Sequence, residues 1–115
     1  MANLRQFNKG ETIQITVTPD TGVTMTSPVL YVYPDSLDLN RNPDTNKIIK
    51  IDTSTGTTTK TFTIGPTTTG GANMPAGDYT VELKYGSSND ITVVKQNHAF
   101  TLVESGYNKK ESASS

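Results

Sequence analysis

The sequence contains no cysteine and only one histidine among its 115 residues. Without cysteine the chain can form no disulfide framework, no zinc–thiolate site and no thiol nucleophile. A single histidine leaves at most one imidazole for a catalytic triad or a metal site. We therefore expect no catalytic residues, no bound metal and no cofactor, and we expect that the protein is not an enzyme.

The sequence also lacks an excess of charge of one sign, and it lacks long apolar runs. Lys and Arg total 10 and Asp and Glu total 11, which gives a formal net charge of −1. Nucleic-acid binding requires a basic patch, and binding to a membrane surface requires a basic amphipathic segment. The longest apolar run, Val29–Tyr33, is far shorter than the roughly 20 residues of a membrane-spanning helix. We expect neither a nucleic acid nor a membrane as a partner.

The N-terminal segment lacks the apolar stretch of a secretory signal. Residues 1–10 contain Leu4 and Phe7 but no continuous hydrophobic core. A secretory signal requires an apolar region of roughly 7 to 15 residues. We therefore expect synthesis in a cytoplasm, where the protein stays or from which it is released by another route.

The pattern that is present is a two-residue alternation. Residues 11–18 alternate polar and apolar side chains, which places Ile13, Ile15 and Val17 on one face of a strand. Residues 29–33 form an unbroken apolar run between two prolines, which is typical of a central strand covered on both faces. Residues 47–52 and 57–64 flank a four-residue loop closed by Gly56, which indicates a hairpin.

Further strands are predicted at residues 78–85, 90–95 and 98–103, with a tight turn or bulge at Gln96 and Asn97. No segment of useful length has helical periodicity. Turn signals recur at about ten-residue intervals, which favours an all-β fold: an antiparallel sandwich or small barrel of about seven strands.

We expect one domain with polar termini. The predicted boundaries are an N-terminal arm at 1–8, the β-domain at 9–104 and a polar C-terminal tail at 105–115. Inward-facing positions of the strands predict the core, which consists of Ile13, Ile15, Val17, Val29, Tyr31, Phe62, Ile64, Tyr79, Val81, Leu83, Phe100 and Leu102.

The candidate sites for chemistry are weak. Asp38–Asp44 places oxygen side chains at alternate positions, as a calcium loop does. However, Pro43 occupies the position that requires glycine, and Ile49 occupies the position of the bidentate glutamate. His98 has no partner acid or nucleophile that the sequence places beside it. It is more simply a histidine at the edge of a strand.

Two segments resemble immunoglobulin-like domains. Pro75–Leu83 reads PAGDYTVEL and resembles the P-A-G-x-Y-x-V start of the penultimate strand in bacterial and phage immunoglobulin-like domains. The resemblance implies an immunoglobulin-like sandwich in which Tyr79 is the corner tyrosine, with its hydroxyl bonded to upstream backbone. Lys9–Val17 reads KGETIQITV and is similar to the opening of such domains in phage baseplate and fibre proteins.

The overall profile is similar to that of small phage capsid decoration proteins, which are threonine-rich and free of cysteine. The resemblance implies a structural virion protein: a capsid decoration or cement protein, or a tail component, that binds and stabilises neighbouring subunits. We expect the major capsid or tail protein as its partner, and a homo-oligomer. The alternative is a carbohydrate- or receptor-binding module that uses Tyr31, Tyr33, Tyr79, Tyr85 and Tyr107.

The termini are the predicted contacts with those partners. Ordering a residue costs about 1–2 kcal/mol, and the polar termini cannot offset this cost within their own chain. Their few apolar side chains would bind a neighbouring subunit, in one mode by adding a strand to its open sheet edge. We therefore predict Leu4, Phe7 and Tyr107 as partner-binding residues.

Overall fold

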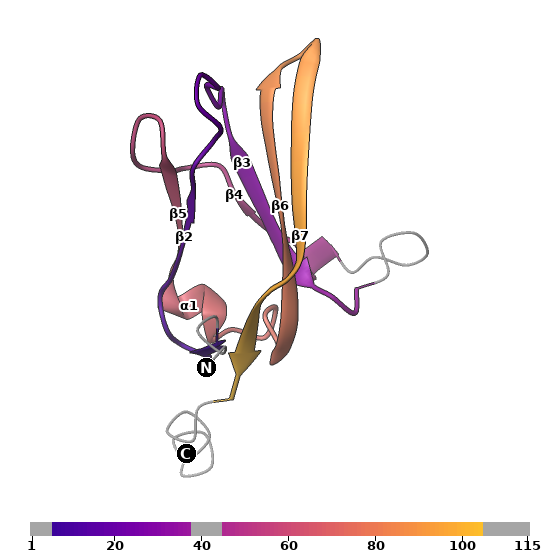
Figure 1. Ribbon diagram of the computed structural model, residues 1–115. Coiled ribbons are helices and arrows are strands. Elements are labelled where there is room, and N and C mark those ends of the chain that lie inside the picture. The colour runs from indigo at the N-terminus through magenta and orange to yellow at the C-terminus, as the bar shows by residue number, and fades with distance from the viewer. Residues whose placement is uncertain (1–5, 38–44, 105–115) are drawn as a thin grey trace.

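The computed structural model describes residues 6–37 and 45–104, and its regular structure is almost entirely β (Figure 1). A single turn of 3₁₀ helix lies at Thr45–Lys47, and a short helix, α1, spans Pro66–Thr69. None of the helices in these two ranges is long and apolar enough to cross a membrane. The strands are β1 (Gln6–Asn8), β2 (Ile13–Val17), β3 (Val29–Pro34), β4 (Ile49–Ile51), β5 (Lys60–Ile64), β6 (Gly77–Ser87) and β7 (Asp90–Val103).

The strands form two sheets. The larger sheet has the order β1-β7-β6-β3-β4, and the smaller consists of β2 and β5. Within the larger sheet β1 runs parallel to β7, with Gln6 opposite Thr101 and Asn8 opposite Val103. The prediction of an all-β fold is confirmed, but the larger sheet is mixed rather than antiparallel throughout. β1 has only three residues, QFN, which is too short for its alternation to reveal a strand in the sequence.

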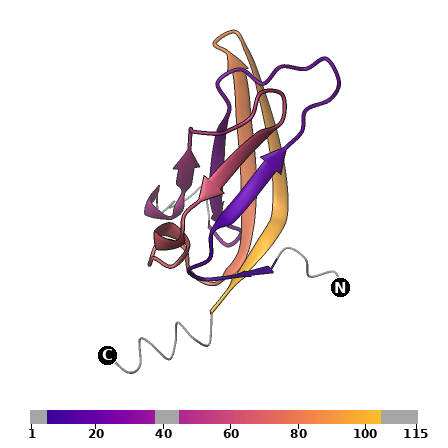
Figure 2. The same ribbon diagram turned by 90° about the vertical axis from the view of Figure 1, so that its left-hand side faces the viewer.

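The smaller sheet lies over one face of the larger one (Figures 1 and 2). Apolar side chains from both sheets fill the space between them, which is the most favourable place for them because it removes them from water. Half-buried Ile15, Val17 and Val81 pack against this core. The predicted core residues that are buried are Ile13, Phe62, Ile64, Tyr79, Leu83, Phe100 and Leu102.

The predicted inward face of β3 is wrong. Leu30 and Val32 belong to the core and are 1% and 0% exposed, whereas Val29 and Tyr31 are half-buried and lie outside it. An unbroken apolar run does not show which of its two faces points inward. The pairing with β6 decides it, because Leu30 lies opposite the buried Leu83.

The predicted hairpin at residues 47–64 is also wrong. β4 pairs with β3 in the larger sheet, whereas β5 pairs with β2 in the smaller one. The intervening residues therefore cross from one layer to the other, and only an isolated bridge between Thr55 and Thr61 closes the turn. Turn chemistry shows that the chain reverses, but not which strand becomes the neighbour.

The last strand runs continuously from Asp90 to Val103, with an irregularity near the predicted bulge. Tyr79 lies opposite Phe100 and Val81 lies opposite Gln96, so Thr80 alone faces the residues between them. His98, in this interval, has a φ of 53°, a left-handed conformation that is uncommon for a residue other than glycine. A bulge of this kind redirects side chains at the edge of a sheet.

Candidate functional site

The edge of β7 is open over most of its length. On one side β6 pairs with it from Asp90 to Leu102, but on the other side β1 reaches only Thr101–Val103. The residues from Asp90 to His98 are all exposed. Within the described parts of the chain, this edge therefore presents unpaired backbone groups to solvent. An open edge is a template for pairing with another strand.

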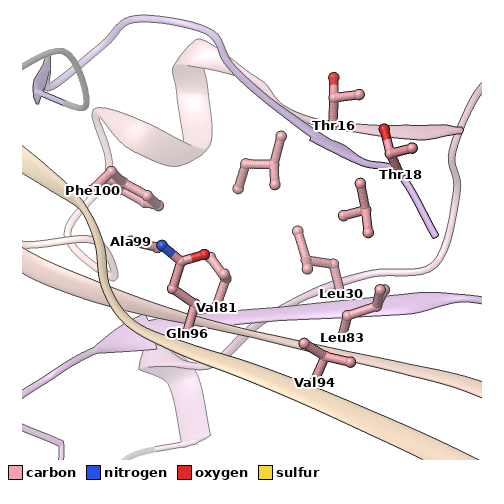
Figure 3. Close-up of a pocket in the computed structure, with 11 residues that line it drawn as sticks. Thr16, Thr18, Leu30, Val81, Leu83, Val94, Gln96, Ala99 and Phe100 are labelled. Carbon is pink, nitrogen blue, oxygen red and sulfur yellow. The ribbon is translucent and has the colours of Figure 1, made fainter. Parts of the chain in front are cut away.

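A groove of about 220 Å³ lies beside this edge, between β2 and β7 (Figure 3). β2 pairs only with β5 among the described strands, so its other edge is also unpaired. Every side chain lining the groove is uncharged, and most are apolar. The lining residues are Ile15, Thr16, Val17, Thr18, Leu30, Val81, Leu83, Val94, Gln96, Ala99 and Phe100.

Val94 shows that this face of the larger sheet is incompletely covered. It lies opposite Leu83, so both side chains point to the same side of the sheet. Leu83 is 4% exposed, but Val94 is 53% exposed. The smaller sheet therefore covers Leu83 of β6 but does not extend over the part of β7 that contains Val94. Val93 is exposed to nearly the same extent, 50%, and points to the opposite face because side chains alternate along a strand.

A second group of polar residues gathers where β3, β6 and β7 lie side by side. Asp35 directly follows β3, Asp78 is near the start of β6, and His98 lies in the irregular part of β7. One ligand atom from each of these residues lies within 4.8 Å of the others. The backbone N–H of Asp35 donates to the carbonyl of Asp78 at 2.9 Å, which fixes the two chain segments relative to each other.

The two carboxylates in this group are held by threonines. Thr80 donates to Oδ1 of Asp35, and Thr101 donates to Oδ1 of Asp78 at 2.6 Å. The Oδ2 atom of Asp35 contacts His98 Nδ1, and Oδ2 of Asp78 lies 3.6 Å from the same nitrogen. Each aspartate thus has one oxygen fixed by a hydroxyl group and the other near the imidazole.

The predicted partner-binding residues are only partly described. Phe7 is in β1 and packs edge-on against Phe100 of its own chain, with ring centroids 5.9 Å apart. Leu4 and Tyr107 lie outside the described residues, as does the Asp38–Asp44 segment. The assignment of Leu4, Phe7 and Tyr107 as contacts with another subunit stays a prediction.

The sequence did not reveal either the groove or the Asp35–Asp78–His98 group. The groove depends on how far one sheet extends over the other, which no local pattern records. The three polar residues are far apart in the chain, and the bulge that brings His98 beside the aspartates interrupts the regular register. One indication was available in the sequence. Asp35 and Asp78 lie near the ends of strands, and His98 lies where the last strand is irregular.

Comparisons with known proteins support only the fold. No protein-family model and no curated protein matches the chain. Among solved structures, the chain is similar to an uncharacterized protein from Bacillus anthracis str. Ames, whose crystal structure has 1.4 Å resolution. The TM-score is 0.51 at 15% sequence identity, and the match covers 89% of this chain and 79% of the other.

Proposed function

We propose that this chain is a non-catalytic, immunoglobulin-like β-sandwich that binds and stabilises neighbouring protein subunits. The strand order supports the immunoglobulin-like assignment: β7, β6 and β3 are adjacent in one sheet, and β2 and β5 form the other. The buried Tyr79, whose hydroxyl donates to the carbonyl of Pro75 at 2.6 Å, supports it further.

The groove between β2 and β7 is the proposed attachment site. Its apolar lining and the two unpaired strand edges beside it are suited to an extended segment of another subunit. Backbone hydrogen bonds to an edge would hold the segment, and apolar side chains on one of its faces would cover Val94. Because the lining is uncharged, we expect the segment to present uncharged side chains to the groove.

The biological setting that we propose is a phage virion, in which the chain is a capsid decoration or tail component. The similarity of Lys9–Val17 to phage baseplate and fibre domains supports this setting. The alternative, a carbohydrate-binding module, would use solvent-facing aromatic rings. Tyr33 and Tyr79 are buried and Tyr31 and Tyr85 are half-buried, so this observation favours attachment to protein.

Two neighbouring valines provide a matched test of the attachment site. Val94→Glu places a charge in the groove, and Val93→Glu places the same charge on the opposite face of β7 at nearly equal exposure. In co-sedimentation with particles that lack the chain, we expect Val94→Glu to lose attachment and Val93→Glu to attach like the unmodified protein. Both variants should retain the melting temperature of the unmodified protein within a few degrees, since both side chains are half exposed.

Equal attachment by the two variants would contradict the groove as the binding site. Saturable binding of a glycan by the purified chain would instead favour the carbohydrate-binding alternative.

A further inference from the structure

We propose that Asp35, Asp78 and His98 form a binding site for a divalent transition metal ion, specifically zinc. This inference goes beyond the attachment function and does not depend on it. The three residues supply two carboxylate oxygens and one imidazole nitrogen within 4.8 Å of one another. Mixed imidazole and carboxylate ligands suit zinc, whereas calcium and magnesium favour oxygen ligands alone.

The arrangement of the carboxylates supports the assignment. The threonine hydroxyl groups hold Oδ1 of Asp35 and Oδ1 of Asp78, so both Oδ2 atoms are left to face the imidazole. Hydrogen bonds of this kind orient the ligands of metal sites in proteins. Thr80 is 2% exposed, so its hydroxyl is fixed by packing as well as by its hydrogen bond.

An independent observation concerns Oδ2 of Asp35. This oxygen has essentially no accessible surface and accepts no hydrogen bond from the described residues. Its contact is with Nδ1 of His98, and the Asp35 side chain as a whole is 21% exposed. An oxygen in this position can share a cation with the imidazole nitrogen.

The charges of the site lead to the same conclusion. Asp35 and Asp78 each place one carboxylate oxygen beside the same nitrogen of His98, and carboxylates this close repel each other. A divalent cation bound between the two carboxylates would offset this repulsion.

The spacing requires only a small adjustment. Two ligand atoms of a tetrahedral zinc ion lie about 3.3 Å apart when each bond is about 2.0 Å. His98 Nδ1 and Asp78 Oδ2 are 3.6 Å apart, which fits this value. Asp35 Oδ2 and His98 Nδ1 lie closer together than this spacing, so these two atoms must move slightly apart to bind one zinc ion. The His98 side chain is 71% exposed, so it is free to rotate.

The bulge in β7 is what makes the site possible. A left-handed φ at a non-glycine residue is energetically unfavourable, and such residues concentrate at functional sites. Here the bulge places the imidazole beside carboxylates that belong to two other segments. A zinc ion at this position would join the end of β3, the start of β6 and the middle of β7.

The test is calorimetric titration of the full-length, tag-free chain with zinc chloride in metal-depleted buffer, with calcium chloride in a parallel titration. We expect saturable binding of one zinc ion per chain and much weaker binding of calcium. Asp35→Asn, Asp78→Asn and His98→Ala should each weaken zinc binding by more than about tenfold. Asp90→Asn is the matched control and should bind zinc like the unmodified chain, because Asp90 lies at the opposite end of the β6–β7 hairpin from Asp78.

A second measurement distinguishes a ligand from a residue that only supports the fold. Because His98 is the only histidine in the chain, the nitrogen NMR spectrum of histidine side chains reports on it alone. Zinc should shift the Nδ1 resonance of His98 in the unmodified chain and in Asp90→Asn. Absence of saturable zinc binding, unchanged affinity in the three ligand variants, or an unperturbed Nδ1 resonance would overturn the proposal.

Discussion

The hydroxyl of Tyr79 donates to the carbonyl of Pro75 at 2.6 Å, and its ring is fully buried and stacked on Phe100 with centroids 5.2 Å apart. One residue thus connects the loop before β6 to the core between the sheets. The resemblance of Pro75–Leu83 to immunoglobulin-like domains predicted that the Tyr79 hydroxyl bonds to upstream backbone, and the hydrogen bond to Pro75 confirms that contact. Local sequence was sufficient because the donor and the acceptor are only four residues apart.

At this scale we predict that Tyr79→Phe lowers the free energy of unfolding by about 1 kcal/mol, the net value of one hydrogen bond. Urea denaturation of the two proteins measures the difference. Tyr85→Phe is the control, because the hydroxyl of Tyr85 makes no hydrogen bond to the described residues and its loss should change stability much less. Equal effects of the two substitutions would show that the hydroxyl of Tyr79 contributes no specific stabilisation.

At the scale of the element, β3 shows how pairing selects the buried face of a strand. Its residues are apolar on both faces, so local sequence left the inward face undecided. The pairing with β6 places Leu30 and Val32 opposite Leu83 and Val81, which face the smaller sheet. Val29 and Tyr31 then lie on the outer face, where they are only half-buried.

This arrangement predicts that alanine substitutions at two neighbouring positions of β3 lower the free energy of unfolding by different amounts. Leu30→Ala should lower the free energy of unfolding by about 2–5 kcal/mol, because it leaves a cavity in the core. Val29→Ala should cost about 1 kcal/mol or less, because its side chain packs on one side only. Thermal or chemical denaturation of both variants tests the assignment, and a larger cost for Val29→Ala would reverse the assigned face of β3.

At the scale of the whole molecule, burial in the folded protein raises the pKa of two tyrosines. Burial, together with a hydrogen bond and the negative charge of Glu82, raises the pKa of Tyr33 to about 12. Burial also raises the pKa of Tyr79 above its ordinary value. Both hydroxyl groups therefore hold their protons more tightly in the folded protein than in the unfolded chain, where the pKa is about 10.

The sign of these shifts predicts alkaline instability. A raised folded-state pKa gives a contribution to stability that is complete below about pH 10 and is lost as the pH rises through the folded-state pKa. The free energy of unfolding should therefore fall between about pH 10 and pH 12. Tyr33→Phe should reduce that fall, which urea denaturation at a series of pH values measures; an identical pH dependence in Tyr33→Phe would contradict this account.

The sequence by itself determined the all-β class, most of the core and the hydrogen bond of the Tyr79 hydroxyl to upstream backbone. These features depend on alternation within a strand or on contacts between residues close in the chain. The tertiary structure alone decided the parallel placement of β1, the separation of β4 and β5 into different sheets and the inward face of β3. It also decided the groove beside Val94 and the convergence of Asp35, Asp78 and His98. Each of these depends on which distant strands become neighbours, and that is set by the packing of whole faces rather than by any local pattern.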